Sequence, residues 1–474
     1  MSKKNYNQGC PKPLLIGCIC LVLVSAIAVA LLWLLPHGNT SVSPSGPQLQ
    51  TPLTPTETDP VLPTETEPVP TLPPPVQVES TATLISTGDV LMHMPVVNTG
   101  KQADGSYDFE SVFRYITPYV TDADYAIANL ETTLCGTDNG YQYSGYPCFN
   151  CPDEIATSAQ SAGFDAFTTV NNHCYDTRTV GLKRTLETLR GMNMGTLGTR
   201  ASTDESKFVI QNINNINIGM IAYTYSTTDD NGRPNINGIP TSADSLGLIN
   251  TFDMNSFAPF YTEMEQQLAA MREAGAEAIV VFMHWGYEYQ LTPSTQQTTL
   301  AQKLCDMGVD VIIGGHPHVV QPMALLTSNT DPEHKTVCLY SMGNAVSNQR
   351  LGKIQSISTA HTEDGVLFSV SFSKYSDGTV ALEGVELIPC WVNLHTGNGR
   401  SEYNILPLDD STRDQWQTLY SLSDNTMLAA ERSYTRTMQL VQAPLEQCQE
   451  YLAQAKADRE AAYEAAAAQA VPGY

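Results

Sequence analysis

Positive charge is scarce in this chain of 474 residues, in which 24 Lys and Arg stand against 49 Asp and Glu and give a formal net charge of −25. A surface with this balance repels a phosphate backbone, so the sequence predicts no nucleic-acid partner. The chain also lacks a serine nucleophile elbow and a P-loop. Histidine is rare at 9 residues. Two of the nine nevertheless stand one residue apart in GGHPHVVQP, which begins at Gly314.

Only one run is long and apolar enough to suggest a membrane segment. Residues 14–35 carry no charge over 22 positions, which is enough helix to cross a hydrocarbon core of ~30 Å. Three lysines and no acid precede the run, so the positive-inside rule places residues 1–13 in the cytoplasm. We therefore predict a single-pass signal-anchor helix in the cell membrane, with the main domain extracellular. Cleavage after Ala30 and lipid attachment at Cys18 are alternatives that the pattern favours less.

The residues that follow this run change character. Residues 36–80 contain no Lys or Arg and are dominated by Pro, Thr, Ser and Glu, a composition that cannot form a packed core. A polyproline-like chain at ~3.1 Å per residue would reach on the order of 130 Å, so we predict a linker. Globular patterning then predicts one domain over 81–395. Residues 396–474 are rich in Ala, Glu and Gln and predict a mostly helical C-terminal extension.

Four cysteines cluster in and after a Gly- and Tyr-rich stretch, at positions 135, 148, 151 and 174. Outside a membrane such cysteines commonly form disulfides, and we predict at least one disulfide bond within this group. A zinc knuckle built on Cys148-x-x-Cys151 is the alternative, although a second CxxC pair is missing. The connectivity does not follow from one sequence.

From Thr81 onward, short β-branched apolar runs alternate with helical periodicity near 179–191 and 256–274, which predicts an α/β fold. Five successive runs stop at residues able to bind a metal. In chain order these are Asp89, Glu131, Asn172 with His173, His284, and His316 with His318. Sheet enzymes place their ligands beyond the carboxyl ends of strands. Carboxylate, amide and imidazole ligands together suit a divalent ion such as Zn²⁺, Mn²⁺ or Fe²⁺, so we predict a divalent metal site.

The histidine doublet supports this prediction through its local geometry. Pro317 fixes its own φ and biases His316 towards an extended conformation. In an extended segment, residues two apart point to the same side, so His316 and His318 would face one point. Gly314 and Gly315 would leave room for something to approach. Two surface histidines in a turn are the alternative reading of the same letters.

The short motifs GDV, NLE, NNHxxD, HWGxEY, GGHPHVVQP and YSMGN occur in this order over residues 84–350. In order and spacing they resemble those of the bacterial capsule-synthesis CapA family, the poly-γ-glutamate synthesis accessory proteins. That family is similar to calcineurin-like metallophosphatases, which implies a four-layer α/β/β/α sandwich. The resemblance also implies a membrane-anchored extracellular protein that helps to make, export or anchor an anionic capsule polymer.

The resemblance implies a set of metal ligands: Asp89, Glu131, Asn172, His284, His316 and His318. It places His173 beside the leaving group, and Asp176 would orient that imidazole. Glu131 stands where a second acidic ligand or an acid–base group would be. Two features depart from the phosphatase pattern, because Leu91 replaces a histidine and NLE replaces GDxxD. A complete two-metal phosphatase site therefore does not follow from the sequence.

Two functions fit these observations. The first is an accessory enzyme with metal-dependent hydrolase or transferase chemistry, in which His173, Asp176 and Glu131 are catalytic. Without a P-loop, ATP-driven polymerisation would belong to a membrane-bound polymer synthetase complex as partner. The second is a polymer-binding or scaffolding protein that keeps a structural metal site.

Overall fold

The computed structural model describes residues 76–469, apart from 139, 356 and 398. All of the described residues belong to one compact unit. The predicted transmembrane segment 14–35 and most of the linker 36–80 lie outside them. No helix between residues 76 and 469 is both long and apolar enough to cross a membrane.

The first sheet joins residues from both ends of this unit. Its strand order is β17 (Arg400–Pro407), β16 (Val380–Gly397), β15 (Asp364–Tyr375), β1 (Val78–Val90), β2 (Tyr125–Leu130), β3 (Ala166–Thr168) and β4 (Gly195–Leu197), and β14 (Asn344–Val346) pairs with β1. Strands β1 to β4 run parallel, and β15 runs antiparallel to β1. The carboxyl ends of β1, β2 and β3 therefore meet at one edge.

The second sheet is built around four parallel strands. Its order is β12 (Val320–Thr327), β13 (Lys335–Met342), β11 (Val311–Gly315), β10 (Ala278–His284), β6 (Ile216–Thr228), β7 (Pro234–Ile236) and β8 (Ile239–Pro240), and β5 (Phe208–Ile213) and β9 (Thr251–Asp253) pair with β6. Strands β13, β11, β10 and β6 are parallel. Their carboxyl ends again share one edge.

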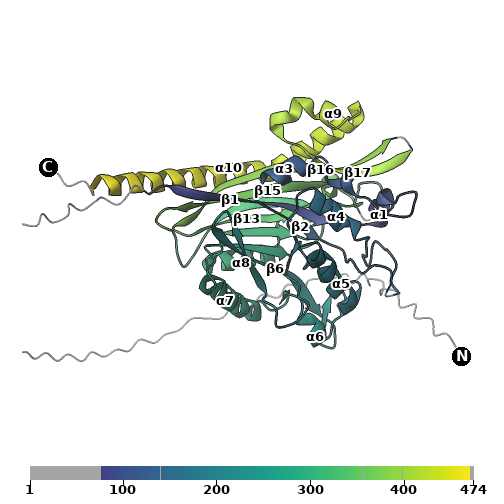
Figure 1. Ribbon diagram of the computed structural model, residues 1–474, viewed down its shortest axis with the longest axis horizontal. Coiled ribbons are helices and arrows are strands. Elements are labelled where there is room, and N and C mark those ends of the chain that lie inside the picture. The colour runs from purple at the N-terminus through teal and green to yellow at the C-terminus, as the bar shows by residue number, and fades with distance from the viewer. Residues whose placement is uncertain (1–75, 139, 356, 398, 470–474) are drawn as a thin grey trace, which may run out of the picture. The chain divides into compact units, whose positions relative to one another are not determined.

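The two sheets face each other across a common apolar core. Leu84 and Phe368 of the first sheet belong to the same buried cluster as Val280 and Ile313 of the second. Helices α1 (Met94–Gly100), α2 (Glu110–Phe113), α3 (Thr117–Asp122) and α4 (Glu154–Ser161) contribute to a cluster on the other face of the first sheet. Helices α7 (Ala258–Glu273) and α8 (Thr295–Asp306) do so for the second sheet (Figure 1). The predicted α/β fold is confirmed as a mixed fold with two sheets.

Two further helices follow β3 and β8 in the chain. Helix α5 (Arg178–Gly191) coincides with the helical periodicity expected near 179–191, and short helix α6 (Ala243–Leu246) follows later in the chain. The 3-10 segments η1 (Ala360–Glu363) and η2 (Asp410–Gln415) and the short helix α9 (Trp416–Leu419) lie in the C-terminal third. Segment η1 precedes β15, whereas η2 and α9 connect β17 to the long C-terminal helix.

The C-terminal helix α10 (Asp424–Gln469) packs along β16 of the first sheet and β12 of the second (Figure 1). Its residues Val441, Leu445 and Leu452 enter the core between the sheets. The guanidinium of Arg436 and the hydroxyl of Ser433 both donate to the carboxylate of Asp364 at the start of β15. The helix therefore closes the space between the sheets, and the predicted boundary between residues 395 and 396 falls inside β16.

Gly88 precedes Asp89 in β1, and a substitution there tests how tightly β1 packs against the segment around Gly343. A Cβ at Gly88 would lie 2.0 Å from the backbone oxygen of Gly343, so Gly88→Ala must push β1 away from its neighbour. Overpacking of this kind costs about 1–3 kcal/mol. We expect urea unfolding to show a loss of this size. Gly191→Ala is the matched control, because its Cβ would meet nothing within 4 Å, and an unchanged midpoint for Gly88→Ala would contradict the packing described.

Candidate metal centre

The six residues predicted as metal ligands come together at the seam between the two sheets. Asp89 is the penultimate residue of β1, Glu131 follows β2, and His284 ends β10. Asn172 follows β3, and the histidine doublet follows β11. None of the six is more than 4% exposed. The shared carboxyl edge of the parallel strands is what brings them together.

Asp89 and His318 form a buried ion pair across the seam. The Nδ1 atom of His318 lies 3.2 Å from Oδ2 of Asp89, and the side-chain amide of Asn129 donates to Oδ1 over 2.7 Å. Burial raises the pKa of Asp89, but the hydrogen bond and charge of His318 outweigh it, so the pKa lies below its ordinary value. Burial likewise opposes a charged His318, yet Asp89 holds the pKa of His318 above normal.

Glu131 is fully buried without a hydrogen bond. Neither carboxylate oxygen has a hydrogen-bond partner among the described residues, although Oε1 lies 3.4 Å from Nε2 of His284 and 3.8 Å from Nε2 of His318. Burial and the nearby charge of Asp89 raise its pKa well above the ordinary value. A buried carboxyl group without partners requires an explanation, and a bound cation supplies one.

The candidate ligand atoms form two overlapping groups. One consists of Glu131, His284 and His316, and the other of Asp89, Glu131 and His318. Within each group the ligand atoms lie within 4.8 Å of one another. Nδ1 of His316 also has no hydrogen-bond partner in the described part of the chain. Orphaned oxygen and nitrogen atoms in this arrangement fit a borderline divalent ion, with Glu131 common to both positions.

Asn172 joins the first group through His284. Its side-chain oxygen lies 2.8 Å from Nε2 of His284, so the two predicted ligands are in direct contact. Burial lowers the pKa of His284 to about 3 and that of His316 well below its ordinary value. Both imidazoles are therefore neutral at physiological pH, which is the form that binds a metal.

The backbone of the doublet differs from the predicted extended conformation. His316 and His318 have φ values of 94° and 55°, both in the left-handed region that non-glycine residues rarely adopt. The two rings still converge, with centroids 6.0 Å apart. The turn is held by the surrounding contacts, including the backbone amide of His316 directed at Asp89 over 3.4 Å. Backbone strain of this kind is concentrated at functional sites.

The two glycines before the doublet allow close approach of protein groups. A Cβ at Gly314 would lie 2.0 Å from the backbone oxygen of Tyr340 in β13. One at Gly315 would lie 3.0 Å from Oδ1 of Asp89. The space that Gly314 and Gly315 were predicted to leave is therefore occupied by the neighbouring strand β13 and by the carboxylate of Asp89.

His173 and Asp176 lie beside the two groups and form a pair. Nδ1 of His173 is 2.8 Å from Oδ2 of Asp176, which also accepts the backbone N–H of Phe149 over 2.6 Å. The ring of Phe149 packs edge-on against His173 at 4.6 Å. His173 follows Asn172 in the chain, and the side-chain oxygen of Asn172 contacts His284, so the pair lies next to the metal ligands. The fixed Nδ1 leaves Nε2 of His173 as the atom able to exchange a proton.

Three further residues support the site but were not predicted. The side chain of Asn129 donates to Asp89 and accepts from Asn171. The side-chain oxygen of Asn344 lies 3.1 Å from Nδ1 of His318. The ring of Tyr225 lies 4.9 Å from the ring of His316. Asn129 and Asn344 stand at strand ends, so the rule that identified Asp89 could have identified them. The strand-end rule would not have identified Tyr225.

The predicted disulfide bond does not form between two members of the cysteine group. Cys135, Cys151 and Cys174 are buried free thiols, so no disulfide joins two members of the group. Burial raises the pKa of Cys174 to about 12, which makes its thiolate unfavourable. Hydrogen bonds order this segment instead. The side chain of Asn150 accepts the backbone N–H of Cys135 and donates to the backbone oxygen of Gly136.

These features define the protein as a two-sheet α/β protein with a buried carboxylate–imidazole site suited to divalent metal ions. The chain belongs to the family of the bacterial capsule synthesis protein PGA_cap, whose family model matches residues 83–349. This match covers more than half of the 474 residues and includes every predicted site residue.

Two characterised proteins are similar in sequence. The chain is 26% identical over 308 residues to "Capsule biosynthesis protein CapA" of Bacillus anthracis, covering 64% of this chain and 67% of that protein. It is 27% identical over 264 residues to "PGA biosynthesis protein CapA" of Bacillus subtilis (strain 168), covering 55% of this chain and 62% of that protein. The solved NAD nucleotidase of Haemophilus influenzae matches 76% of this chain and 68% of its own at 13% identity and a TM-score of 0.40, which does not establish a shared fold.

Because the two ligand groups share Glu131, we expect variants of the site to lose different amounts of metal. His316→Ala removes a ligand from one group only and His318→Ala from the other, so each protein should retain about half of the bound Mn²⁺ after dialysis. Glu131→Gln should lose both ions, because both groups contain Glu131. Elemental analysis measures the content, and circular dichroism checks folding. His395→Ala, an exposed histidine outside the site, is the control, and equal losses in all three site variants would contradict two overlapping positions.

The pKa shifts predict that metal binding releases protons. The raised pKa values favour the protonated forms of Glu131 and His318 in the metal-free protein, whereas His284 and His316 are already neutral. A metal binds the deprotonated groups, so affinity must rise with pH and fall as acid restores the protons. Calorimetry in two buffers of different ionisation enthalpy should show net release of protons on metal binding. Net uptake, or an affinity independent of pH, would contradict this prediction.

Proposed function

We propose that this protein is an accessory enzyme of capsule biosynthesis, with metal-dependent hydrolase or transferase chemistry of the metallophosphatase type. Its substrate would be an anionic polymer of the poly-γ-glutamate type or a precursor of that polymer. The observation that carries this proposal is the juxtaposition of two metal-ligand groups sharing Glu131 with the His173–Asp176 pair. Family membership and the names of the two relatives support the capsule assignment.

The residues of this site divide into those that bind metal and those that move a proton. Asp89, Glu131 and the three histidines of the two groups would hold the ions. Bound divalent ions supply polarisation of a phosphoryl or acyl oxygen and a lowered pKa for a bound water. His173 would then donate a proton from Nε2 to the leaving group, because Asp176 engages Nδ1. Asp176 acts as a positioning residue.

One observation favours a second function. Every metal ligand is at most 4% exposed, and Leu91, which stands where the phosphatase pattern has histidine, is buried in the core. A site this enclosed is also what a structural metal requires. In that case the protein would bind or tether capsule polymer without turning it over.

We further propose where the protein acts and with which partners. The apolar run 14–35 and the acidic linker support a single-pass membrane protein whose main domain is extracellular. The anionic capsule polymer would be its ligand, and a membrane-bound polymer synthetase complex would supply the ATP-driven step. The excess of acidic residues supports the exclusion of nucleic acid.

An activity assay of the full-length protein distinguishes the two functions. With Mn²⁺ or Zn²⁺ present, we expect hydrolysis of either a generic phosphodiester or poly-γ-glutamate. His173→Ala should lower kcat by about 10²- to 10⁴-fold with unchanged metal content, because it removes proton transfer rather than a ligand. Asp176→Asn should shift the pH profile, and the exposed His395→Ala should behave as wild type. Metal-loaded wild-type protein that turns over neither substrate would contradict the enzyme and favour the scaffold.

A further inference from the structure

A second cleft lies outside the metal centre. Its volume is about 520 Å³, and it is formed by α1, the segment after β14, and strands β16 and β17. Its lining consists of Pro95, Asn98, Thr99, Lys101, Asn348, Lys353, Leu394, Arg400, Ser401 and Tyr403. Three of these side chains are cationic and none is acidic, in a chain that has twice as many acids as bases. We call this the basic cleft.

The three cations of the basic cleft are free to bind an anion. Lys101, Lys353 and Arg400 are exposed, and none of them forms an ion pair with a carboxylate of residues 76–469 as described. Arg400 donates only to neutral oxygens, those of the Gln102 side chain and the Lys101 backbone. An unpaired cation on an otherwise acidic protein is a site of locally positive potential.

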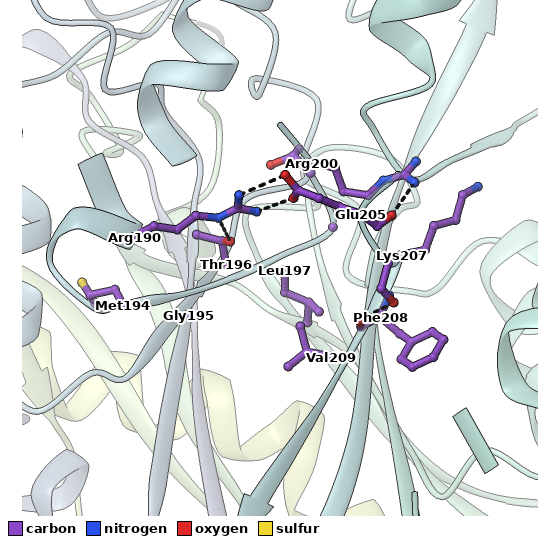
Figure 2. Close-up of a pocket in the computed structure, with 13 residues that line it drawn as sticks. Arg190, Met194, Gly195, Thr196, Leu197, Arg200, Glu205, Lys207, Phe208 and Val209 are labelled. Atoms are coloured by element: carbon purple, nitrogen blue, oxygen red, sulfur yellow. Dashed lines mark hydrogen bonds and ion pairs between the residues drawn. The ribbon is translucent and has the colours of Figure 1, made fainter. Parts of the chain in front are cut away.

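Another cavity of this protein has a different arrangement of charge. That cavity, of about 350 Å³, is lined by Arg190, Arg200 and Lys207 together with Glu205 (Figure 2). Arg190 forms an ion pair with Glu205 at 2.8 Å, which Figure 2 shows as dashed lines, and Lys207 pairs with Glu263 at 2.6 Å. Two of its three cations are therefore already neutralised. The basic cleft has no such internal partner.

A relay of side-chain contacts links the inner wall of the basic cleft to His173, beside the metal centre. The hydroxyl of Tyr403 donates to the side-chain oxygen of Asn348 over 2.6 Å, and the backbone N–H of Asn348 donates to Nδ1 of His93 over 3.3 Å. The ring of His93 packs against Phe149 at 5.1 Å, and Phe149 packs against His173 at 4.6 Å. A short chain of contacts therefore joins the cleft to the residue proposed to donate a proton.

We propose that the basic cleft binds carboxylate groups on one segment of an anionic polymer while a neighbouring segment of the same polymer reaches the metal centre. This inference rests on the proposed function and names the binding surface for its substrate. Regularly spaced carboxylates on a flexible chain can engage Lys101, Lys353 and Arg400 together, and simultaneous contacts add to one another. A flat lipid surface would not enter a concave cleft, so a polymer fits the shape better than a membrane.

Binding of a labelled oligomer by the full-length protein tests this proposal. The probe is a fluorescent γ-linked oligoglutamate, measured by anisotropy in EDTA so that neither metal nor turnover contributes. The combined Lys101→Gln, Lys353→Gln and Arg400→Gln variant should bind it on the order of ten-fold more weakly, because each exposed ion pair contributes a few-fold. A neutral γ-linked oligoglutamine should bind weakly to both proteins, and added salt should reduce the difference between them.

The control variant changes the same amount of charge elsewhere. Arg114→Gln, Lys183→Gln and Arg432→Gln replace three exposed cations that also form no ion pair with a carboxylate of the described chain and do not line the cleft. We expect this variant to lose about two-fold or less. Equal losses in both variants would show a general charge effect and overturn the proposal. Unchanged binding in the cleft variant would also overturn it.

Two further measurements separate this inference from its alternatives. If the cleft variant loses binding to phosphatidylglycerol vesicles but keeps oligoglutamate binding, the cleft faces a membrane and the polymer proposal is wrong. If wild-type protein binds oligoglutamate through the cleft but metal-loaded protein turns nothing over, the cleft stands and the enzymatic function fails. Turnover with unchanged oligomer binding in the cleft variant refutes the cleft alone.

Discussion

Two carboxylates are buried completely within one site, and their electrostatic requirements organise the seam between the sheets. Asp89 is compensated by His318 and by the amide of Asn129, whereas Glu131 has no hydrogen-bond partner in the described structure. An isolated buried charge is unfavourable by several kcal/mol, so such a group either takes up a proton or binds a cation. The fold retains Glu131 as the common member of two carboxylate–imidazole groups, and this arrangement suits a divalent metal ion.

The surrounding architecture keeps these groups in place. Parallel strands in both sheets present their carboxyl ends at the same edge. Gly88 and Gly314 allow neighbouring backbones to approach closely, which holds the site residues at that edge. The left-handed turn at His316 and His318 depends on that packing, since isolated residues would not adopt it. Helix α10 closes the core between the sheets from the C-terminal side. Stability and site geometry are therefore coupled through the same contacts.

The proposed metal centre and the proposed basic cleft have complementary roles: one acts on a bond of the polymer, and the other holds the polymer. A small enclosed metal centre can act on a single bond, but a polymer also has to be held in register with that bond. Lys101, Lys353 and Arg400 gather unpaired positive charge on an otherwise acidic protein, next to the wall that leads through His93 to His173. A scaffold without turnover would use the same cleft, so polymer binding is common to both functions.

The sequence by itself determined the strand-end residues of the site and the mixed α/β class, because short buried strands and their polar last residues are local features. It did not reveal β6, whose run INIGMIAYTYSTT is largely buried and lacks clear alternation, or the antiparallel β15, β16 and β17 that extend the first sheet. Burial of the cysteines, the left-handed doublet and the sharing of Glu131 were decided only by tertiary structure. Each depends on groups far apart in the chain: Glu131 meets His284 and His318 only because two separate sheets pack face to face.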